Sequence, residues 1–167
     1  VLQETWLFGS SLRANLCYGR EDATDEEIYT ALKEAHMYDF VMRLPDKLET
    51  QVGAHALKIS EGQRQLLTIA RTMISQPDML ILDEATSGLD PVMRDDILDV
   101  FLEFVQDENH SILMSSHITT DLEKVADYIT FIHQGKVLFC KTKDELRYNY
   151  GIIRCGAALF DQLDKAE

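Results

Sequence analysis

The amino-acid sequence predicts an α/β fold built around a parallel sheet. Two short, continuous apolar runs, at residues 79–82 and 112–114, have the length and composition of buried strands. Between them, after Pro91, apolar side chains recur at helical spacing at Ile97, Val100, Phe101, Phe104 and Val105. A strand, a helix and a second strand in this order form a βαβ unit, so we expect the two strands to run parallel and to end at one edge of the sheet.

The length and the charge of the chain limit its organisation and its partners. With 167 residues, of which 46% are hydrophobic, the chain is long enough for one domain with a sizeable core. Asp and Glu number 29 against 16 Lys and Arg, which gives a formal net charge of −13. Because this charge would repel a phosphate backbone, we expect no nucleic acid among the partners.

The cysteines and the hydropathy pattern indicate no zinc site, disulfide framework or membrane span. Cys17, Cys140 and Cys155 are far apart, and none belongs to a Cys-x-x-Cys motif. No apolar run approaches the roughly 20 residues of a membrane-spanning helix, and the first residues lack the basic region of a signal peptide. We expect a soluble, cytosolic chain. Because it opens with Val1 at what looks like the end of a strand, its N-terminus is expected to be a cut.

Local signals predict several helices and one hairpin. In a capping box, a Ser or Thr side chain and a Glu or Gln three residues later satisfy each other's backbone amides at a helix start. Four pairs fit this pattern: Thr24 with Glu27, Ser60 with Gln63, Thr120 with Glu123, and Thr142 with Glu145. The second pair opens a helix predicted over about residues 61–76, which Pro77 ends. Residues 128–132 and 137–139 predict a hairpin with Gly135 in its turn.

Polar residues follow both predicted parallel strands directly. Asp83 and Glu84 come after residues 79–82, a strand that we expect to be buried on both faces. His117 comes shortly after the second strand, residues 112–114. Because ligands bind outside the carboxyl ends of parallel strands, Asp83, Glu84 and His117 are expected to converge on one edge of the sheet.

The Asp83-Glu84 pair resembles a Walker B element. In such an element the first carboxylate helps to hold Mg²⁺, and the second polarises the water that attacks a phosphate. Taken alone, the pair is explained equally well as an acidic exit from a strand. Other motifs are needed to separate these two interpretations.

Further motifs follow one another along the chain in the same order and with the same spacing as in one protein family. Residues 59–65, Ile-Ser-Glu-Gly-Gln-Arg-Gln, resemble the signature motif of the ABC ATPase family, usually written LSGGQ, although a plain capping box would also explain this segment. Residues 87–90, Ser-Gly-Leu-Asp, are similar to the D-loop of that family, His117 to its switch histidine, and Gln3 to its Q-loop glutamine. A lone histidine is more often structural, but four elements in order favour the family. The resemblance covers the chain to about Cys155.

The resemblance implies an ABC-type ATPase that uses ATP and Mg²⁺, with three catalytic residues. It implies that Glu84 is the general base and that His117 contacts the γ-phosphate. Gln3 would sense both Mg²⁺ and the attacking water, and Asp83 would support the metal. Since these roles come from the family, they are expectations for this chain.

The resemblance also implies a composite ATP site. Two ATPase domains of this family pair head to tail, as a homodimer or a heterodimer. Ser60, Gly62 and Gln63 would therefore complete the nucleotide site of a second ABC ATPase domain, and Asp90 would lie near the shared interface. Each chain would contribute half of each site.

Three features depart from the family pattern. Glu61 stands where the family often has glycine, and its carboxylate would repel a phosphate unless it points outward. Residues 52–56 replace the glutamate-containing loop through which exporters touch their membrane helices. The phosphate loop Gly-x-x-x-x-Gly-Lys-Ser/Thr is missing, because two alanines follow Gly151 and Gly156, which have its spacing. In the family this loop precedes the Q-loop glutamine, so we expect a truncated chain with negligible ATP hydrolysis of its own.

With the resemblance, the expected fold becomes more specific. It is an α/β, P-loop-NTPase-like parallel sheet with an inserted α-helical subdomain and without the N-terminal core strands. The helical subdomain with the signature helix is expected at about residues 10–76 and the core subdomain at about 77–155. Residues 156–167 would form a weakly defined C-terminal extension.

The two halves of the chain resemble different branches of the family. Residues 1–86 look like exporters of the multidrug type, and the sequence from Ser87 onward looks like stand-alone ATPase subunits that serve separate permeases. Residues 82–87 are shared by both branches. A join within this stretch is the corresponding hypothesis.

The expected function is that of an ATP-binding, ATP-hydrolysing subunit or domain of an ABC transporter. Its partners would be a second ABC ATPase domain and a transmembrane permease, and it would lie in the cytoplasm on the inner face of the cell membrane. The alternative is a soluble ABC protein that acts on ribosomes or DNA. Against this alternative stand the acidic charge, the absence of coiled-coil heptads, and residues 6–8, which in exporters face the coupling helices of the permease.

Overall fold

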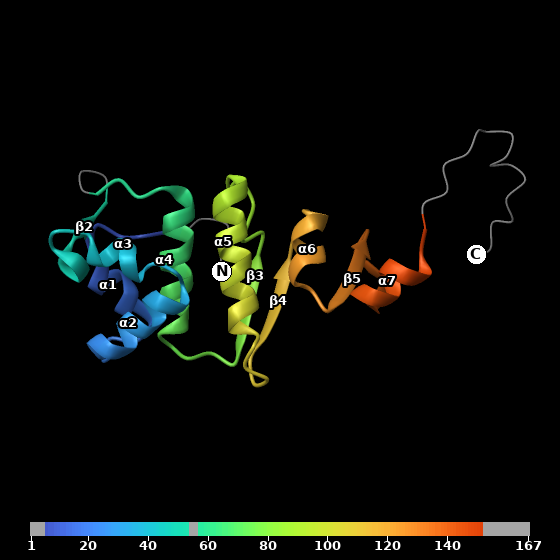
Figure 1. The fold of residues 1–167 in the computed structure, drawn as a ribbon, viewed down its shortest axis with the longest axis horizontal. Coiled ribbons are helices and arrows are strands. Elements are labelled where there is room, and N and C mark those ends of the chain that lie inside the picture. The colour runs from blue at the N-terminus through green and yellow to red at the C-terminus, as the bar shows by residue number, and fades with distance from the viewer. Residues whose placement is uncertain (1–5, 54–56, 152–167) are drawn as a thin grey trace, which may run out of the picture. The chain divides into compact units, whose positions relative to one another are not determined.

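A computed structural model describes residues 6–53 and 57–151 (Figure 1). The chain forms two compact units, Val1–Val125 and Ala126–Glu167. Within the described residues, no helix is both long enough and apolar enough to cross a membrane. The described residues form both helices and strands, among them a β-α-β run from β3 to β4, which confirms the predicted α/β class.

The N-terminal part of the first unit is helical. It contains α1 (Leu12–Leu16), α2 (Asp25–Glu34), α3 (Tyr38–Met42), α4 (Glu61–Met73) and the short 3₁₀ turns η1 (Cys17–Gly19) and η2 (Lys47–Glu49). Two short strands, β1 (Ser10–Ser11) and β2 (Gln51–Val52), pair antiparallel beside these helices. Helix α4 ends three residues before the predicted limit, because Gln76 adopts a left-handed conformation (φ 48°) just before Pro77.

Three of the four predicted capping pairs lie at helix starts. Both hydrogen bonds of the capping box form at Thr24 before α2 and at Ser60 before α4. Thr142 accepts the N–H of Glu145 at the start of α7 (Lys143–Asn149). The prediction for Thr120 is wrong, because α6 (Thr119–Val125) already includes this residue in its first turn.

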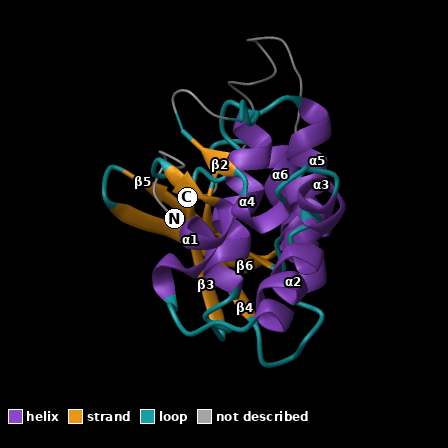
Figure 2. Ribbon diagram, turned by 90° about the vertical axis from the view of Figure 1, so that its left-hand side faces the viewer, coloured by secondary structure: helices purple, strands orange, loops and turns teal. Residues whose placement is uncertain are grey.

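The predicted βαβ unit is present. Strand β3 (Met79–Asp83), helix α5 (Pro91–Phe104) and strand β4 (Ser111–Ser115) follow one another, and β3 pairs parallel with β4. Asp83 lies opposite Ser115 in this register, so both strands end at the same edge. In Figure 2, helices α2–α5 lie to one side of β3 and β4.

The expectation that β3 is buried on both faces is wrong for this chain. Leu80 and Leu82 are each only 2% exposed, whereas Ile81 is 61% exposed, and so is its cross-strand partner Leu113. Alternation of this kind arises because successive side chains of a strand point to opposite faces of the sheet. The described helices cover one of these faces, and the other remains open to solvent.

One hydrophobic core joins the helical part to the βαβ unit. Leu66 and Leu67 of α4, Ile97 and Phe101 of α5, and Leu80 of β3 belong to a single cluster of buried side chains. The first unit therefore contains residues from both predicted subdomains. The boundaries of the helical and core subdomains stay a prediction.

The second unit is the predicted hairpin followed by α7. Strands β5 (Tyr128–His133) and β6 (Lys136–Thr142) pair antiparallel, with an irregular register between Phe131 and Ile132. Gln134 and Gly135 turn the chain with positive φ angles of 49° and 74°. Such angles suit the tight turn of a hairpin, in which glycine is favoured.

Candidate functional site

The carboxyl ends of β3 and β4 bring the two acidic residues of the predicted Walker B element to Ser115. The Ser115 hydroxyl donates a hydrogen bond to Asp83 Oδ1. The Ser115 carbonyl accepts the backbone N–H of Glu84 at 3.2 Å. Because Asp83 and Ser115 are register partners, the parallel pairing itself creates these contacts. Ser115 therefore anchors the backbone of Glu84 and the side chain of Asp83.

Glu84 leaves the strand in a left-handed conformation, with a φ of 50°. Positive φ is uncommon for residues other than glycine and costs of order 1 kcal/mol or more, so the surrounding contacts must hold it. Glu84 Oε2 lies 2.5 Å from His117 Nδ1. The Glu84 side chain is 23% exposed and the His117 side chain 67% exposed. The predicted convergence of Asp83, Glu84 and His117 is confirmed.

The predicted D-loop leads into α5. Asp90 is the N-cap of this helix, and its Oδ1 accepts the backbone N–H groups of Val92 and Met93, both at 3.1 Å. Pro91 occupies the first helical position, as predicted, because its fixed φ and missing N–H suit that place. The Asp90 side chain thus has a local structural role, and its place near a shared interface stays a prediction.

The signature segment forms the N-terminus of α4. Ser60 Oγ accepts the N–H of Gln63 at 3.2 Å, and Gln63 Oε1 accepts the N–H of Ser60 at 3.1 Å. Glu61 Oε2 lies 3.5 Å from Arg64 Nη1, one turn along the helix. This ion pair offsets the negative charge that Glu61 adds next to Ser60. That charge is the reason why the sequence suggests repulsion of a phosphate at this position.

Gly62 packs closely against α5. A Cβ atom at this position would lie 2.6–2.8 Å from three side-chain atoms of Met93. No larger residue fits at Gly62 without movement of Met93. The close approach joins the start of α4 to the start of α5, the helix that Asp90 caps.

The predicted site residues fall into two groups. Glu84 bonds to His117 and Ser115, while Ser60 and Gln63 bond to each other. Gln3 lies outside the described residues. Division into two groups is the arrangement expected if the signature residues serve a different nucleotide site from the carboxylates.

An aromatic patch on the first unit consists of the exposed Trp6 and Tyr18 and the half-buried Phe8. The Trp6 and Phe8 rings are 5.4 Å apart, and the Phe8 and Tyr18 rings 5.5 Å apart. Trp6 is 59% exposed and Tyr18 66% exposed. Exposed aromatic side chains that cluster in this way mark surfaces that other proteins contact.

The buried Asn15 and the half-buried Arg71, which the sequence did not single out, support this patch. Asn15, only 1% exposed, accepts the N–H of Phe8 and donates to the Phe8 carbonyl. Arg71 of α4 donates to the Asn15 carbonyl at 2.6 Å and to the Trp6 carbonyl at 3.2 Å. Burial lowers the pKa of Arg71 from its ordinary value. The signal that could have revealed Asn15 is an amide placed between the apolar Leu12 and Leu16.

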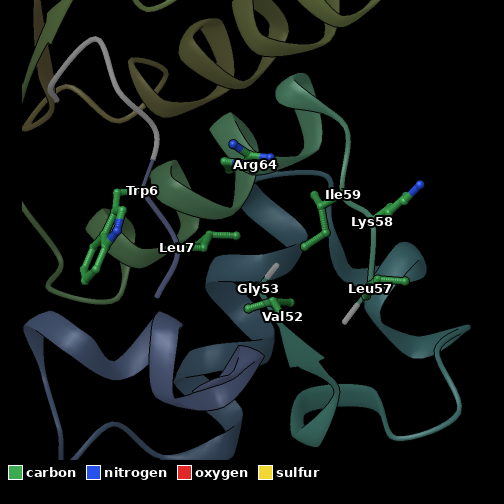
Figure 3. A pocket seen from close by; sticks show the side chains of 8 residues that line it. All are labelled: Trp6, Leu7, Val52, Gly53, Leu57, Lys58, Ile59 and Arg64. Atoms are coloured by element: carbon green, nitrogen blue, oxygen red, sulfur yellow. The ribbon is translucent and has the colours of Figure 1, made fainter. Parts of the chain in front are cut away.

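A cavity of about 460 Å³ opens beside the patch (Figure 3). Leu7 and Ile59 point toward its middle, and the Lys58 side chain extends away from it. Its lining comes from the start of the chain and from the segment that leads into α4: Trp6, Leu7, Val52, Gly53, Leu57, Lys58, Ile59 and Arg64. Residues 54–56, part of the unusual loop noted in the sequence, are outside the described residues.

Comparisons with known proteins agree on one family. A family model described as ABC transporter matches residues 1–87. A multidrug efflux ATP-binding/permease protein of Mycobacterium bovis is 38% identical over 146 residues, which are 87% of this chain and 12% of that protein. An ATP-dependent lipid A-core flippase of Chromobacterium violaceum is 40% identical over 137 residues, 82% of this chain and 23% of the flippase.

A solved structure gives the same result for the fold. The structure of a bacterial Atm1-family ABC exporter with ATP bound superposes with a TM-score of 0.75 and 32% sequence identity. The match covers 89% of this chain and 26% of the exporter chain. The predicted P-loop-NTPase-like ABC fold is confirmed for the part that this chain represents.

The comparisons also bear on the alternatives. These relatives are named as permease, flippase and exporter proteins, so no support arises for an action on ribosomes or DNA. The chain spans about a quarter or less of the length of each of them. Similarity to the flippase extends over 137 residues, well beyond the 87 that the family model matches. The assignment of the second half to stand-alone subunits, and a join within residues 82–87, stay predictions.

Proposed function

Because this chain belongs to the ABC transporter family and corresponds to part of the ATP-binding domain of its exporters, we propose that it provides half of two composite ATP sites in a transport motor. The observation that carries the proposal is the 2.5 Å contact between Glu84 and His117 at the sheet edge, separate from the Ser60–Gln63 cap. Glu84 and His117 act on the ATP of the domain's own site. Ser60, Gly62 and Gln63 act on the ATP of the partner domain.

In the proposed mechanism, Glu84 is the general base. A carboxylate within hydrogen-bond reach of a water can take its proton as the water attacks the γ-phosphate. His117 Nδ1 donates to the Glu84 carboxylate, and when the ring is doubly protonated Nε2 can also donate to a phosphate oxygen. His117 thus links the base to the phosphate, and its 67% exposure lets it meet a ligand at the edge.

Asp83 has the properties of a Mg²⁺ ligand. Its carboxylate is exposed at the strand end and receives a hydrogen bond from Ser115 at Oδ1, which fixes its orientation. Among the described residues, no three His, Cys, Asp or Glu side chains gather closely enough to hold a metal. Mg²⁺ is commonly bound through one or two carboxylates together with water and substrate phosphates, so Asp83 with Gln3 fits this ion. When bound, Mg²⁺ would neutralise part of the negative charge of the phosphates.

The N-terminus of α4 suits a phosphate of the partner's ATP. The first N–H groups of a helix have no partner within the helix and carry the positive end of its dipole. The side-chain oxygen of Ser60 accepts one bond in the cap, and its hydroxyl hydrogen remains able to donate. The Glu61–Arg64 ion pair keeps this surface compatible with an anion.

The aromatic patch and the neighbouring cavity are the proposed contact with the permease. Trp6 and Tyr18 expose apolar rings, and the cavity of about 460 Å³ beside them has an apolar centre formed by Leu7 and Ile59. An amphipathic helix from a membrane domain could place an apolar side chain in such a cavity. This contact would hold the domain at the cytoplasmic face of the membrane.

The test uses a graft, in which this chain replaces the matching 137-residue segment of the ATPase domain of the Chromobacterium flippase. The flippase supplies the phosphate loop. We expect Mg²⁺-dependent ATP hydrolysis, reduced by about 10²–10⁴-fold by Glu84→Gln because the general base is lost. Asp95→Asn, a change in an exposed ion pair with Lys124, is the matched control and leaves the rate unchanged.

Binding of a fluorescent ATP analogue verifies that each graft is folded. A graft that binds the analogue yet hydrolyses ATP equally fast with and without Glu84→Gln would contradict the proposed role. The isolated 167-residue chain serves as a second control, for which we expect negligible hydrolysis.

A further inference from the structure

A buried hydrogen bond joins two polar residues that the mechanism above does not use. The Thr86 hydroxyl donates to Asp121 Oδ2 at 2.6 Å. Thr86 is 1% exposed and Asp121 2% exposed, although Asp is rarely buried so completely. The two residues are 35 positions apart in the sequence. A buried carboxylate is costly unless it is hydrogen-bonded, and the Thr86 hydroxyl supplies such a bond to Asp121.

The position of this bond relates it to the Glu84–His117 pair. Thr86 follows Glu84 by two residues, in the turn between β3 and α5. Asp121 follows His117 by four residues, in the first turn of α6. The bond therefore connects the two segments that carry the base and the histidine, just beyond the strand ends.

Ser115 and the buried Thr86–Asp121 bond fix the chain on either side of Glu84. On the strand side of Glu84, Asp83 is held by the Ser115 hydroxyl. On the other side, Thr86 is held by Asp121. Glu84, with its positive φ of 50°, lies between these two anchors. Such a conformation persists only where its neighbours fix it, and hydrogen bonds to a charged acceptor are the strong ones.

A second side chain of α6, Lys124, contacts α5. Lys124 forms ion pairs with Asp95 at 3.2 Å and Asp99 at 2.8 Å, both on α5. These side chains are exposed, and the pairs tie α6 to α5 instead of to the Glu84 turn. Lys124 is therefore a suitable control position on the same helix.

We propose that Asp121 is a positioning residue, which acts through Thr86 to fix Glu84 against His117. The meaning of that pair for ATP hydrolysis rests on the proposed function. The geometry itself does not, because both side chains of the Glu84–His117 contact belong to this chain, in which the contact can be measured directly.

The test records the ring-nitrogen NMR signals of His117 in the 167-residue chain, assigned by their loss in His117→Gln. Glu84→Ala gives the reference signal of a histidine without its partner. We expect Asp121→Ala to move the His117 Nδ1 signal toward that reference. Asp121→Asn keeps an oxygen acceptor for Thr86 and is expected to restore the wild-type signal, and Lys124→Met leaves it unchanged.

A purely structural role would give a different result. If Asp121→Ala is less stable in urea but folded, with the His117 signal at its wild-type position, the proposal is overturned. If Asp121→Ala fails to fold, the same comparison is made with Thr86→Val against Thr86→Ser, which keeps the hydroxyl. An unmoved signal in folded Thr86→Val would equally overturn it.

The graft separates this inference from the proposed function. There, Asp121→Ala is expected to lower kcat about tenfold with an unchanged KM for ATP, because a misplaced base affects the chemical step and not binding. Asp121→Asn restores kcat. If the NMR signal moves as expected while the graft shows no dependence on Glu84, the proposed function fails and the positioning contact stands.

Discussion

At the residue scale, Gly62 is where the signature segment packs most tightly against its neighbour. The absence of a side chain lets α4 approach Met93 of α5. Two opposing effects meet at this position. Alanine in place of glycine favours a helix by about 1 kcal/mol, whereas overpacking a filled site costs about 1–3 kcal/mol. Since one of the three close Met93 atoms is its Cβ, which cannot move without the backbone, overpacking should win.

Gly62→Ala is therefore expected to destabilise the chain by about 1 kcal/mol or more in urea unfolding, as overpacked sites do. In a Met93→Gly background the same change should become neutral or stabilising, because all three close atoms are gone and only the helix propensity remains. A Gly62→Ala cost that is identical in both backgrounds would show that Met93 is not the cause.

The positions of the site residues were predictable where these residues directly follow regular structure. Asp83, Glu84 and His117 follow apolar strands, and parallel pairing alone brings them together. Asp121 could not be found in this way. Its contact with Thr86 joins residues 35 positions apart, and no local pattern encodes which side chains a fold will bury together.

At the scale of single elements, the start of α2 makes the stability of the fold depend on pH. Glu27 Oε2 accepts the N–H and the hydroxyl of Thr24, both at 2.8 Å, and Glu27 Oε1 lies 2.5 Å from Arg20 Nη2. These contacts hold the pKa of Glu27 below its ordinary 4.5. The largest effect comes from the Thr24 N–H, followed by the Thr24 hydroxyl and by Arg20. A carboxyl group whose pKa is lower in the folded than in the unfolded state stabilises the fold at pH values above its unfolded-state pKa. This stability is lost as the pH falls through the folded-state pKa.

We expect Glu27→Gln to lower the melting temperature at pH 7, because the charged acceptor is lost. The difference from the wild type should shrink as the pH is lowered from 4.5 towards 3, where the carboxylate becomes protonated. Glu26→Gln, in the same first turn, is the matched control. Thermal unfolding at several pH values measures both, and a Glu27→Gln difference that grows on acidification would contradict the assignment.

Helix α5 permits a similar test of its N-cap. Asp90→Ala is expected to cost about 1 kcal/mol of folding stability, because the Val92 and Met93 amides lose their acceptor. Asp90→Asn keeps an oxygen in place and should recover most of it. In the graft, a loss of hydrolysis by a folded Asp90→Asn would show that Asp90 has a role beyond capping.

Elements were predictable to the extent that their signals are local. The boxes at Thr24 and Ser60 were correct because each involves residues only three positions apart. At Thr120 the same signal failed, since the helix begins at Thr119, two residues before the start at Asp121 that an N-cap at Thr120 predicts. The exposure of one face of β3 could not be read from its apolar run, because it depends on which other elements cover the sheet.

At the scale of the whole molecule, the open face of the β3–β4 sheet is an apolar surface. Met79, Ile81 and Leu113 are each more than half exposed on this face. Exposed apolar surface of this kind favours association with other chains, and an uncovered strand edge adds to it. The opposite face is well buried, with Leu82 only 2% exposed.

Leu113→Thr is therefore expected to reduce concentration-dependent association, as measured by light scattering, with little change in folding stability. Leu82→Thr is the matched control on the buried face and should cost about 2–5 kcal/mol, as other large-to-small core changes do. Equal destabilisation by the two substitutions would mean that the open face is buried in solution.

The central claim is that one chain supplies the base for its own ATP and the signature serine for its partner's. Two inactive grafts test it, one with Glu84→Gln and one with Ser60→Arg, mixed before dimers form. In a mixed head-to-tail dimer, one site carries both defects and the other carries neither.

The account predicts that ATP hydrolysis by the mixture exceeds the sum of the two grafts measured separately. Glu84→Gln mixed with a graft that carries both substitutions is the control and stays inactive, because neither site of that dimer keeps Glu84. If the two single variants form mixed dimers, detected by affinity tags, and the mixture hydrolyses no more ATP than the separate grafts, Glu84 and Ser60 do not serve different sites and the account is wrong.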